Sequence, residues 1–326
     1  MAKIWIKNGH FITWNEQNPV LEGHLIIEGD TIQYLGESAP ESDSQFDEVI
    51  DGRHRLYMPG FSNTHNHAPM SLLRGYSDDL KLQEWLENKM WPNEAKFTDE
   101  DVYWATRLSI IEMVKSGTTC YVDMYDRMDQ VASAVEESGM RACLTRGIIG
   151  FGDDQTRKEK LDEARNFASD WHGKADGRIT TMMSPHSPYT CPPRFIEQIV
   201  DSAAQLGLPI HTHMSETLTE VEQNVAQYGK RPVQHLLDLG VFERPSLVAH
   251  AVHLTDEEIQ ILADHKVHVS HNPGSNLKLA SGIARVPELL EAGVLVSLGT
   301  DGPASNNNLD MLEEIRLAAL LHKGQS

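Results

Sequence analysis

The amino-acid sequence predicts an α/β protein, in which residues 57–326 form a (β/α)8 barrel of the TIM type and residues 1–56 form a small β-sandwich unit. Two observations predict the barrel. Eight short apolar runs alternate with helical patterns over roughly 250 residues, which matches the count and length of that fold. Histidine and acidic side chains also gather where the runs end, and catalytic residues of such barrels lie at the carboxyl ends of the strands.

The first 56 residues are predicted to form the β unit because apolar and polar side chains alternate there in short runs. Ile4 and Ile6 show this alternation, and Asn8-Gly9 and Gly29-Asp30 are turn signals between runs. So short a unit cannot bury both faces of its sheet. We therefore expect it to be part of a composite β-sandwich that needs strands from another segment.

The barrel strands are predicted at 56–61, 118–124, 141–149, 178–184, 208–214, 246–250, 266–271 and 294–299. Helices are predicted at 98–116, 156–171, 192–207, 286–293 and 309–322, with further helical stretches ending near 139 and 239 and one beginning at Thr255. A doubly wound open sheet is the alternative. It would need a glycine-rich phosphate loop after its first strand, and the segment 59–67 is not one.

A candidate metal site begins with His65 and His67, which follow the first predicted strand. Residues i and i+2 of a strand point to the same face, so both imidazoles can reach one ion. Asp301 follows the eighth strand. At the end of the fifth strand His211 or His213 could bind, and His213 is favoured because Glu216 follows it by three residues.

Imidazole and carboxylate ligands suit Zn²⁺, or Fe²⁺ with similar geometry. A second metal would need a bridging anion, such as a modified lysine at the end of the fourth strand. Residues 178–189 contain no lysine. We therefore expect one metal ion per chain, held by His65, His67, His213 and Asp301.

These residues suggest a hydrolytic reaction on an aromatic amidine. A bound cation lowers the pKa of water, and Asp301 beside it can take the proton. Glu216 can carry a proton to a ring nitrogen and then to a leaving amine, and His250 can stabilise the attacking oxygen. A glutamate that shuttles protons without binding the metal is what hydrolytic deamination requires.

Composition narrows the class of partner. The 326 residues carry a formal net charge of −20, which argues against nucleic acid or an anionic membrane as a main partner. Three cysteines without a Cys-x-x-Cys pair indicate neither a disulfide framework nor a thiolate zinc site. With no apolar run of membrane-spanning length, a cytoplasmic location is expected.

Several segments resemble the amidohydrolase superfamily, and within it the 5-methylthioadenosine/S-adenosylhomocysteine deaminases are most similar. The matching segments are PGFSNTHNHAPMSLLRGYSDDL, WLENKMWPNEAKF, SGTTCYVDMY, SPHSPYTCP, HTHMSET, AHAVHL, SHNPGSNLKLASGIA and LGTDGPASNNNLDM. The resemblance implies zinc-dependent deamination of S-adenosylhomocysteine, 5'-methylthioadenosine or adenosine to the inosine analogue and ammonia. It also implies an enzyme that often assembles as a homo-oligomer.

The resemblance further implies substrate contacts for Glu94 with ribose hydroxyls, His186 with the nucleoside and Arg146 with a homocysteine carboxylate. Arg157 is a candidate second arginine. Against these roles, Arg146 could be an ordinary ion-pair partner at a strand end, and Glu94 a helix-start acid. The alternatives for the whole chain are another aminohydrolase or chlorohydrolase acting on a triazine or cyclic amide, or a non-catalytic scaffold fragment.

The sequence departs from the family after the eighth helix. Family members usually continue with a further helical segment and with strands that complete the small β unit, whereas this sequence stops at residue 326. We expect the C-terminal part of the β-sandwich to be missing from it, which would leave the N-terminal strands with an unpaired edge.

Overall fold

The computed structural model describes residues 2–324 and divides into two compact units, Met1–Gly60 and Phe61–Ser326. The first unit contains one five-stranded sheet in the order β3-β2-β1-β4, with β5 also paired to β1. The strands are β1 (Lys3–Ile12), β2 (Val20–Glu28), β3 (Thr31–Gly36), β4 (Glu48–Asp51) and β5 (Leu56–Tyr57). Trp5 and Phe11 on β1 are buried, so alternate residues of this central strand form the unit's small core.

The strand predicted at 56–61 is wrong in its bounds. Leu56–Tyr57 pairs in parallel with β1, within the N-terminal unit. The strand that precedes the paired histidines is β6 (Phe61–Asn66), so that His65 lies inside a strand and His67 directly after it. Pro59 and Gly60 separate the two strands, and a proline removes the backbone donor that a continuous ladder would need.

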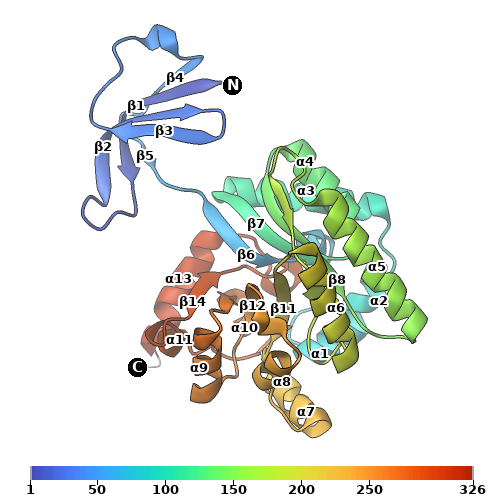
Figure 1. The fold of residues 1–326 in the computed structure, drawn as a ribbon. Helices are drawn as coiled ribbons and strands as arrows, with labels where there is room; N and C mark the ends of the chain where they lie inside the picture. The colour runs from blue at the N-terminus through green and yellow to red at the C-terminus, as the bar shows by residue number, and fades with distance from the viewer. Residues whose placement is uncertain (1, 325–326) are drawn as a thin grey trace. The chain divides into compact units, whose positions relative to one another are not determined.

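The second unit is built on two parallel sheets, as Figure 1 shows. One sheet contains β6, β7 (Thr118–Tyr125), β8 (Arg141–Ile148), β9 (Ile179–Thr181) and β10 (Ser184–Pro185), and the other contains β11 (Ile210–Met214), β12 (Ser246–His250), β13 (His268–His271) and β14 (Leu295–Leu298). The strand predicted at 178–184 is therefore two short strands, because pairing with β8 is interrupted between Thr181 and Ser184.

Backbone and side-chain contacts join these two sheets at both edges. At one edge Met183 bridges Ile210 in parallel, and the Met183 carbonyl accepts from His211 N–H at 3.0 Å. At the other edge the Thr64 hydroxyl lies 2.9 Å from the Leu298 carbonyl, and Asp301 N–H donates to the His65 carbonyl at 2.9 Å. This arrangement is consistent with a TIM-type fold.

The long helices lie outside the strands in Figure 1. They are α3 (Asp99–Lys115), α4 (Met128–Ser138), α5 (Asp154–Trp171), α6 (Pro193–Leu206), α7 (Leu218–Tyr228), α8 (Pro232–Asp238), α9 (Asp256–Asp264), α11 (Val286–Glu291) and α13 (Met311–Leu321). The predicted starts at Thr98 and Thr255 are confirmed as capping boxes. Gly139 and Gly207 end α4 and α6 in the left-handed conformation, which costs glycine little.

The sequence reasoning missed the short helices that follow β6, β13 and β14. They are η2 (Ala68–Leu73), α1 (Leu82–Trp85), the π-helical turn η3 (Leu86–Met90), α2 (Trp91–Glu94), α10 (Pro273–Lys278) and α12 (Pro303–Asn306). Each has only four to six residues, so its apolar pattern covers at most two helical turns. These segments form walls of the cavity described below.

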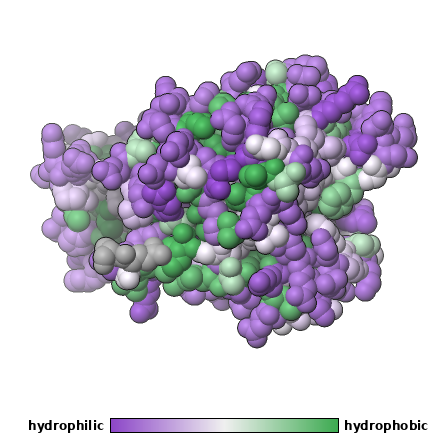
Figure 2. All heavy atoms as spheres, turned by 90° about the horizontal axis from the view of Figure 1, so that it is seen from below, coloured by the Kyte–Doolittle hydropathy of each residue, from purple (hydrophilic) through white to green (hydrophobic). Residues whose placement is uncertain are grey.

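Apolar side chains of the strands fill the interior of the second unit. Ile210, Val248 and Val269 belong to one fully buried cluster, and Tyr121 and Leu144 belong to another. Burying a side chain of this size contributes about 1.5–3 kcal/mol, so these clusters hold the strand ends in fixed positions. Hydrophilic side chains cover most of the face seen in Figure 2. Within residues 2–324, no helix has the length and apolarity to cross a membrane.

Candidate active site

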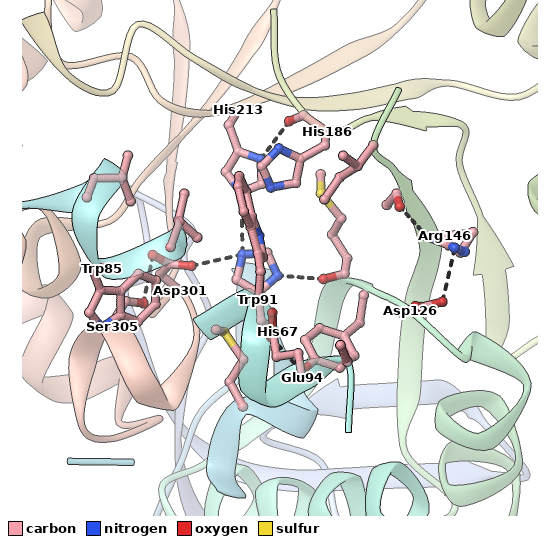
Figure 3. Close-up of a pocket in the computed structure, with 18 of the residues that line it drawn as sticks. His67, Trp85, Trp91, Glu94, Asp126, Arg146, His186, His213, Asp301 and Ser305 are labelled. Atoms are coloured by element: carbon pink, nitrogen blue, oxygen red, sulfur yellow. Dashed lines mark hydrogen bonds and ion pairs between the residues drawn. The ribbon is translucent and has the colours of Figure 1, made fainter. Parts of the chain in front are cut away.

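Seven of the predicted residues lie where the strands of the second unit end, and Figure 3 labels four of them, His67, His186, His213 and Asp301. They come from five strand ends, and they are His65 and His67 at β6, His186 after β10, His213 and Glu216 at β11, His250 at β12 and Asp301 after β14. All of them except His65 line one cavity of about 500 Å³. Residues far apart in the sequence are therefore brought into one site.

The four predicted ligands converge on a common point. Asp301 Oδ1 lies 3.3 Å from His65 Nε2 and 3.2 Å from His67 Nε2. His213 Nε2 lies 3.3 Å from His67 Nε2. The metal-binding atoms of His65, His67 and His213 all lie within 4.8 Å of one another, which is the spacing of ligands around one ion.

Hydrogen bonds at the opposite ring nitrogens orient two of these imidazoles. His213 Nδ1 donates to the His186 carbonyl at 2.7 Å, and His67 Nδ1 donates to the Met124 carbonyl. A neutral imidazole has one N–H, so these bonds leave the Nε2 lone pairs of His67 and His213 facing the centre. This arrangement is how proteins usually hold histidine ligands.

A second histidine orients His65. His65 Nδ1 lies 2.9 Å from His211 Nε2, and His211 Nδ1 lies 2.9 Å from the Leu247 carbonyl. Only one assignment satisfies both bonds with neutral rings: His211 donates to Leu247, and His65 donates to His211. The His65 Nε2 lone pair then faces the centre. His211 thus points away from the ligand group, behind His65.

These four residues fit a metal cation. His65 Nε2 is fully buried and has no hydrogen-bond donor, and two further lone pairs face it. Buried acceptors that face only one another repel unless a positive charge lies between them. Burial lowers the pKa of His65 and His213 well below the usual value, which keeps both rings neutral and able to bind. Zn²⁺ and Fe²⁺ both accept this ligand set.

The carboxylate of Asp301 completes the group. Burial would raise its pKa, but the His65 and His67 rings beside it hold that pKa well below the usual value. Its Oδ2 accepts from Ser275 Oγ at 2.6 Å and from Ser305 Oγ at 2.9 Å. The two hydroxyls thereby direct Oδ1 toward the histidines, and the carboxylate stays ionised.

His67 shows how strongly this centre attracts positive charge. Burial would lower its pKa, but the Asp301 carboxylate outweighs burial and raises the pKa to about 9. A proton and a metal cation therefore compete for the same lone pair on His67 Nε2.

Glu216 lies beside the ligand group without being part of it. Its side chain is buried, and burial raises its pKa, so this carboxyl can hold a proton nearer to neutral pH than an exposed glutamate does. Oε1 accepts from Ser281 Oγ at 3.2 Å, and Oε2 lies 3.7 Å from His250 Nε2. Such a group can give and take a proton within the cavity.

His250 lies between Glu216 and the ligand group. Its Nδ1 lies 2.8 Å from Asn276 Oδ1, and its backbone has a φ of 73°, a left-handed conformation that aims the ring inward. By distance alone His250 also groups with His65 and Asp301 as a metal-binding set. The sequence analysis did not expect His250 as a ligand, and it assigned no role to Asn276 or Ser281.

The cavity wall beyond the ligand group is largely apolar. Met70, Leu82, Trp85, Leu86 and Trp91 line it, and all of them come from the short helices after β6. Together these side chains make a surface on which an aromatic ring and an apolar tail can pack.

Glu94 and His186 add polar groups to this wall. Glu94 Oε1 accepts from Tyr125 Oη at 2.6 Å, and burial raises the pKa of Glu94. His186 Nδ1 lies 3.2 Å from the hydroxyls of both Ser187 and Thr190, and burial lowers its pKa to about 3. His186 is therefore neutral, and both residues can hydrogen-bond a hydroxyl-bearing ligand.

The distal end of the cavity is charged but internally paired. Arg146 NH2 lies 3.0 Å from Asp126 Oδ1, and Arg146 Nε lies 3.1 Å from Glu163 Oε1, so the guanidinium already has two acidic partners. Lys160 lines the cavity near it, with Nζ donating to the Ile149 carbonyl at 2.8 Å. No sequence signal separated Lys160 from the other charged residues of α5.

Arg157 does not line this cavity among the described residues. Its guanidinium pairs with Asp154 at 2.7 Å and donates to the carbonyls of Gly150 and Gly152. Arg146 therefore lines the cavity, whereas Arg157 stabilises the loop at Gly150–Gly152 before α5.

Comparison with known proteins now adds to this geometry. Residues 56–326 match the amidohydrolase family model. The chain belongs to the amidohydrolase family. The chain is 52% identical over 321 residues to the 5-methylthioadenosine/S-adenosylhomocysteine deaminase of Caldanaerobacter subterraneus subsp. tengcongensis, covering 98% of this chain and 73% of that protein. The protein of the same name from Syntrophomonas wolfei is also 52% identical, with 98% and 74% covered. The resemblance found from sequence is therefore confirmed.

Solved structures also have a fold similar to that of this chain. A zinc-bound adenosine deaminase from Xanthomonas campestris superposes with a TM-score of 0.90 at 36% identity, covering 99% of this chain and 74% of that one. A zinc-bound atrazine chlorohydrolase from Arthrobacter aurescens superposes with a TM-score of 0.89 at 26% identity, covering 98% and 76%.

Proposed function

We propose that this protein is a zinc-dependent aminohydrolase that converts the 6-amino group of adenosine-type nucleosides to a 6-oxo group and releases ammonia. The substrates are S-adenosylhomocysteine, 5'-methylthioadenosine or adenosine. The observation that carries the proposal is the unpartnered, buried Nε2 atom of His65, with His67, His213 and Asp301 converging on it and Glu216 nearby, at one end of a cavity large enough for a nucleoside. Sequence identity of 52% to deaminases of these nucleosides supports the substrate class.

His65, His67, His213 and Asp301 would hold the zinc ion, and iron would fit the same ligands. When bound, the ion supplies a water of lowered pKa at this end of the cavity. No lysine lies within 178–189, where the carbamate bridge of a second metal would be expected, so one ion per chain is proposed. We also propose that the strands of the second unit close into a (β/α)8 barrel, and that the N-terminal sheet is one half of a β-sandwich.

The protein's own groups move the protons. Asp301 accepts the proton of the attacking water, and Glu216 donates its proton to the ring nitrogen next to the reacting carbon. Once oxygen has added to that carbon, Glu216 takes the remaining proton of the new hydroxyl and passes it to the amino group, which leaves as ammonia while the 6-oxo group forms. The proton held by Asp301 then restores Glu216. His250 hydrogen-bonds the attacking oxygen and stabilises the charge that develops there.

Polar groups along the wall would orient the nucleoside. Glu94 accepts hydrogen bonds from the ribose hydroxyls, and His186 contacts the nucleoside from the opposite side. Trp85 and Trp91 pack against the sulfur-bearing tail. Arg146 receives the carboxylate of S-adenosylhomocysteine, for which it must exchange one of its two acidic partners.

A second candidate function is hydrolysis of a triazine ring substituent. Triazine hydrolases share the fold at a TM-score of 0.90 and 25% identity. The test is an ultraviolet assay of the purified, metal-loaded protein with each nucleoside and with a triazine. The proposal expects the adenine-to-hypoxanthine absorbance change and no triazine product. Turnover of the triazine alone would support the second candidate, and Glu216→Gln measures the background.

A further inference from the structure

Three helices within residues 2–324 begin with a threonine followed three residues later by an acid, and two of them use the acid in the usual way. The carboxylate of Asp101 accepts from the Thr98 backbone N–H at 2.8 Å, at the start of α3. The carboxylate of Glu258 accepts from the Thr255 backbone N–H at 2.9 Å, at the start of α9. Both are complete capping boxes, in which threonine and acid satisfy each other's amides.

The third motif, Thr217 to Glu220 at the start of α7, is used differently. Thr217 Oγ1 still accepts from the Glu220 N–H at 3.1 Å. The Glu220 carboxylate, however, reaches past Thr217. Its Oε1 accepts from the Ser215 N–H and its Oε2 from the Glu216 N–H, each at 2.8 Å. Glu220 occupies the third position of a capping box, but its carboxylate binds the backbone amides of Ser215 and Glu216 instead of the amide of Thr217.

Further contacts show that the Ser215–Glu216 turn is held on both sides. Ser215 has a φ of 52°, a left-handed conformation that a non-glycine residue adopts only when its surroundings hold it there. Its carbonyl accepts from the N–H groups of Val252 and His253, both at 3.0 Å. These residues directly follow His250 and Ala251. The Ser215–Glu216 segment therefore hydrogen-bonds both to the Glu220 side chain and to the loop that follows His250.

The carboxylate of Glu220 is completely buried, with 0% of the residue exposed. A carboxylate in such a place is costly unless its hydrogen bonds compensate, so its position calls for a role. Gln83 Nε2 also donates to Thr217 Oγ1 at 3.2 Å, which joins the cavity wall at α1 to the same helix start.

We propose that Glu220 is a positioning residue that sets the orientation of Glu216 by binding both backbone amides at its turn. The inference rests on the proposed function, because it concerns the residue that carries protons there. Without these two hydrogen bonds the turn relaxes, and the Glu216 carboxyl moves relative to the ring nitrogen that it protonates. Metal binding and the substrate contacts at Glu94 and Arg146 stay as they are.

Glu220→Gln tests this directly. The amide keeps the shape of the side chain but presents an N–H group to one of the two backbone donors. We expect kcat for adenosine to fall roughly 10- to 100-fold, because displacement of a catalytic group by about 1 Å costs that much. KM should stay within about threefold and the metal content at the wild-type value. Asp101→Asn is the control: it changes the acid of the capping box at the start of α3, outside the cavity and away from the Ser215–Glu216 turn, and its kcat should not change.

A substrate with a different leaving group separates positioning from a general loss of structure. In 6-chloropurine riboside the leaving chloride needs no proton, whereas the amino group of adenosine does. The Glu220→Gln defect should therefore be several-fold smaller with the chloride. Equal defects on both substrates would overturn the inference. Absence of nucleoside turnover by the wild-type protein would instead count against the proposed function.

Hydrogen–deuterium exchange provides a test without catalysis. In the wild-type protein the amides of Ser215 and Glu216 should exchange slowly, and in Glu220→Gln they should exchange at least tenfold faster, while Asp101→Asn leaves them slow. Rapid exchange in the wild type would overturn the proposal even if Glu220→Gln failed to fold. Glu220→Asp, which keeps the charge but is one methylene shorter, should lose kcat as well, and wild-type kcat in that variant would also contradict it.

Discussion

The two ends of the cavity differ in how their polar groups are satisfied. At one end His65, His67 and His213 direct lone pairs at one another, and His65 Nε2 has no donor at all. At the other end Arg146 is already held by Asp126 and Glu163. We propose that a bound cation completes the first end. The second is complete by itself, so a ligand can bind there only by replacing an existing partner.

This difference implies that the two ends contribute in different ways. A cation should bind strongly to buried acceptors that lack partners. Leaving such acceptors unpaired costs free energy, and the bound cation removes that cost. Exchange of one ion-pair partner for another gains little, since exposed acids such as Glu163 hold their partners weakly. We therefore expect changes at the histidine end to abolish the reaction, and changes at the arginine end to alter only the choice among nucleosides.

The largest effect is expected from His67→Ala, which removes one of the converging lone pairs. Loss of a ligand should reduce the bound metal well below the wild-type amount and lower kcat/KM by roughly 1000-fold or more, the scale of metal assistance to a hydrolytic step. Elemental analysis and the ultraviolet assay measure the two quantities. A variant with full metal content and near-normal turnover would remove His67 from the proposed site.

Glu216→Gln separates proton transfer from metal binding. We expect kcat to fall by on the order of 10²–10⁴-fold, the usual contribution of a general acid–base group, with metal content unchanged. The metal content is the internal control. Full activity in this variant would mean that another group carries the proton.

Arg146→Met removes the guanidinium group from the distal end of the cavity. S-adenosylhomocysteine should lose about 10- to 100-fold in kcat/KM, since a hydrogen-bonded charge pair with the substrate is lost. The same variant should change kcat/KM for 5'-methylthioadenosine, which has no carboxylate, by less than about threefold. Equal losses on both nucleosides would show that Arg146 supports the fold rather than the carboxylate.

The smallest effect is expected from Glu163→Gln, which frees Arg146 of one acidic partner. Because the Glu163 side chain is 52% exposed, the ion pair is weak, and KM for S-adenosylhomocysteine should fall only about 2- to 5-fold. KM for 5'-methylthioadenosine should not change. A rise in KM for S-adenosylhomocysteine would indicate that Glu163 positions Arg146 instead of competing for it.

The residues of the histidine end lie together as the sequence predicted, because the signals for their positions are local. His65 and His67 share one face of an extended segment, and Asp301 and His213 follow apolar runs whose positions are clear from the pattern. Even so, the first strand begins at Phe61 instead of Leu56, because Leu56–Tyr57 pairs with β1. Its bounds depend on pairing across the sheet, which a single strand's pattern does not contain.

Other features depended on tertiary contacts and were missed. Nothing in the sequence indicates that His211 orients His65 or that Lys160 lines the cavity while Arg157 does not. The Thr217–Glu220 motif has the sequence of an ordinary capping box. Only the structure shows that its carboxylate binds the amides of Ser215 and Glu216. Long side chains can choose between neighbouring donors, and packing decides which they take.

The most direct test of the central claim is to measure metal content and turnover of S-adenosylhomocysteine on the same purified sample. We predict about one metal ion per chain, together with the adenine-to-hypoxanthine absorbance change. A chelator should remove both, and zinc should restore both. Turnover that persists in fully metal-free protein would contradict the account, because the converging lone pairs would then have no part in the reaction.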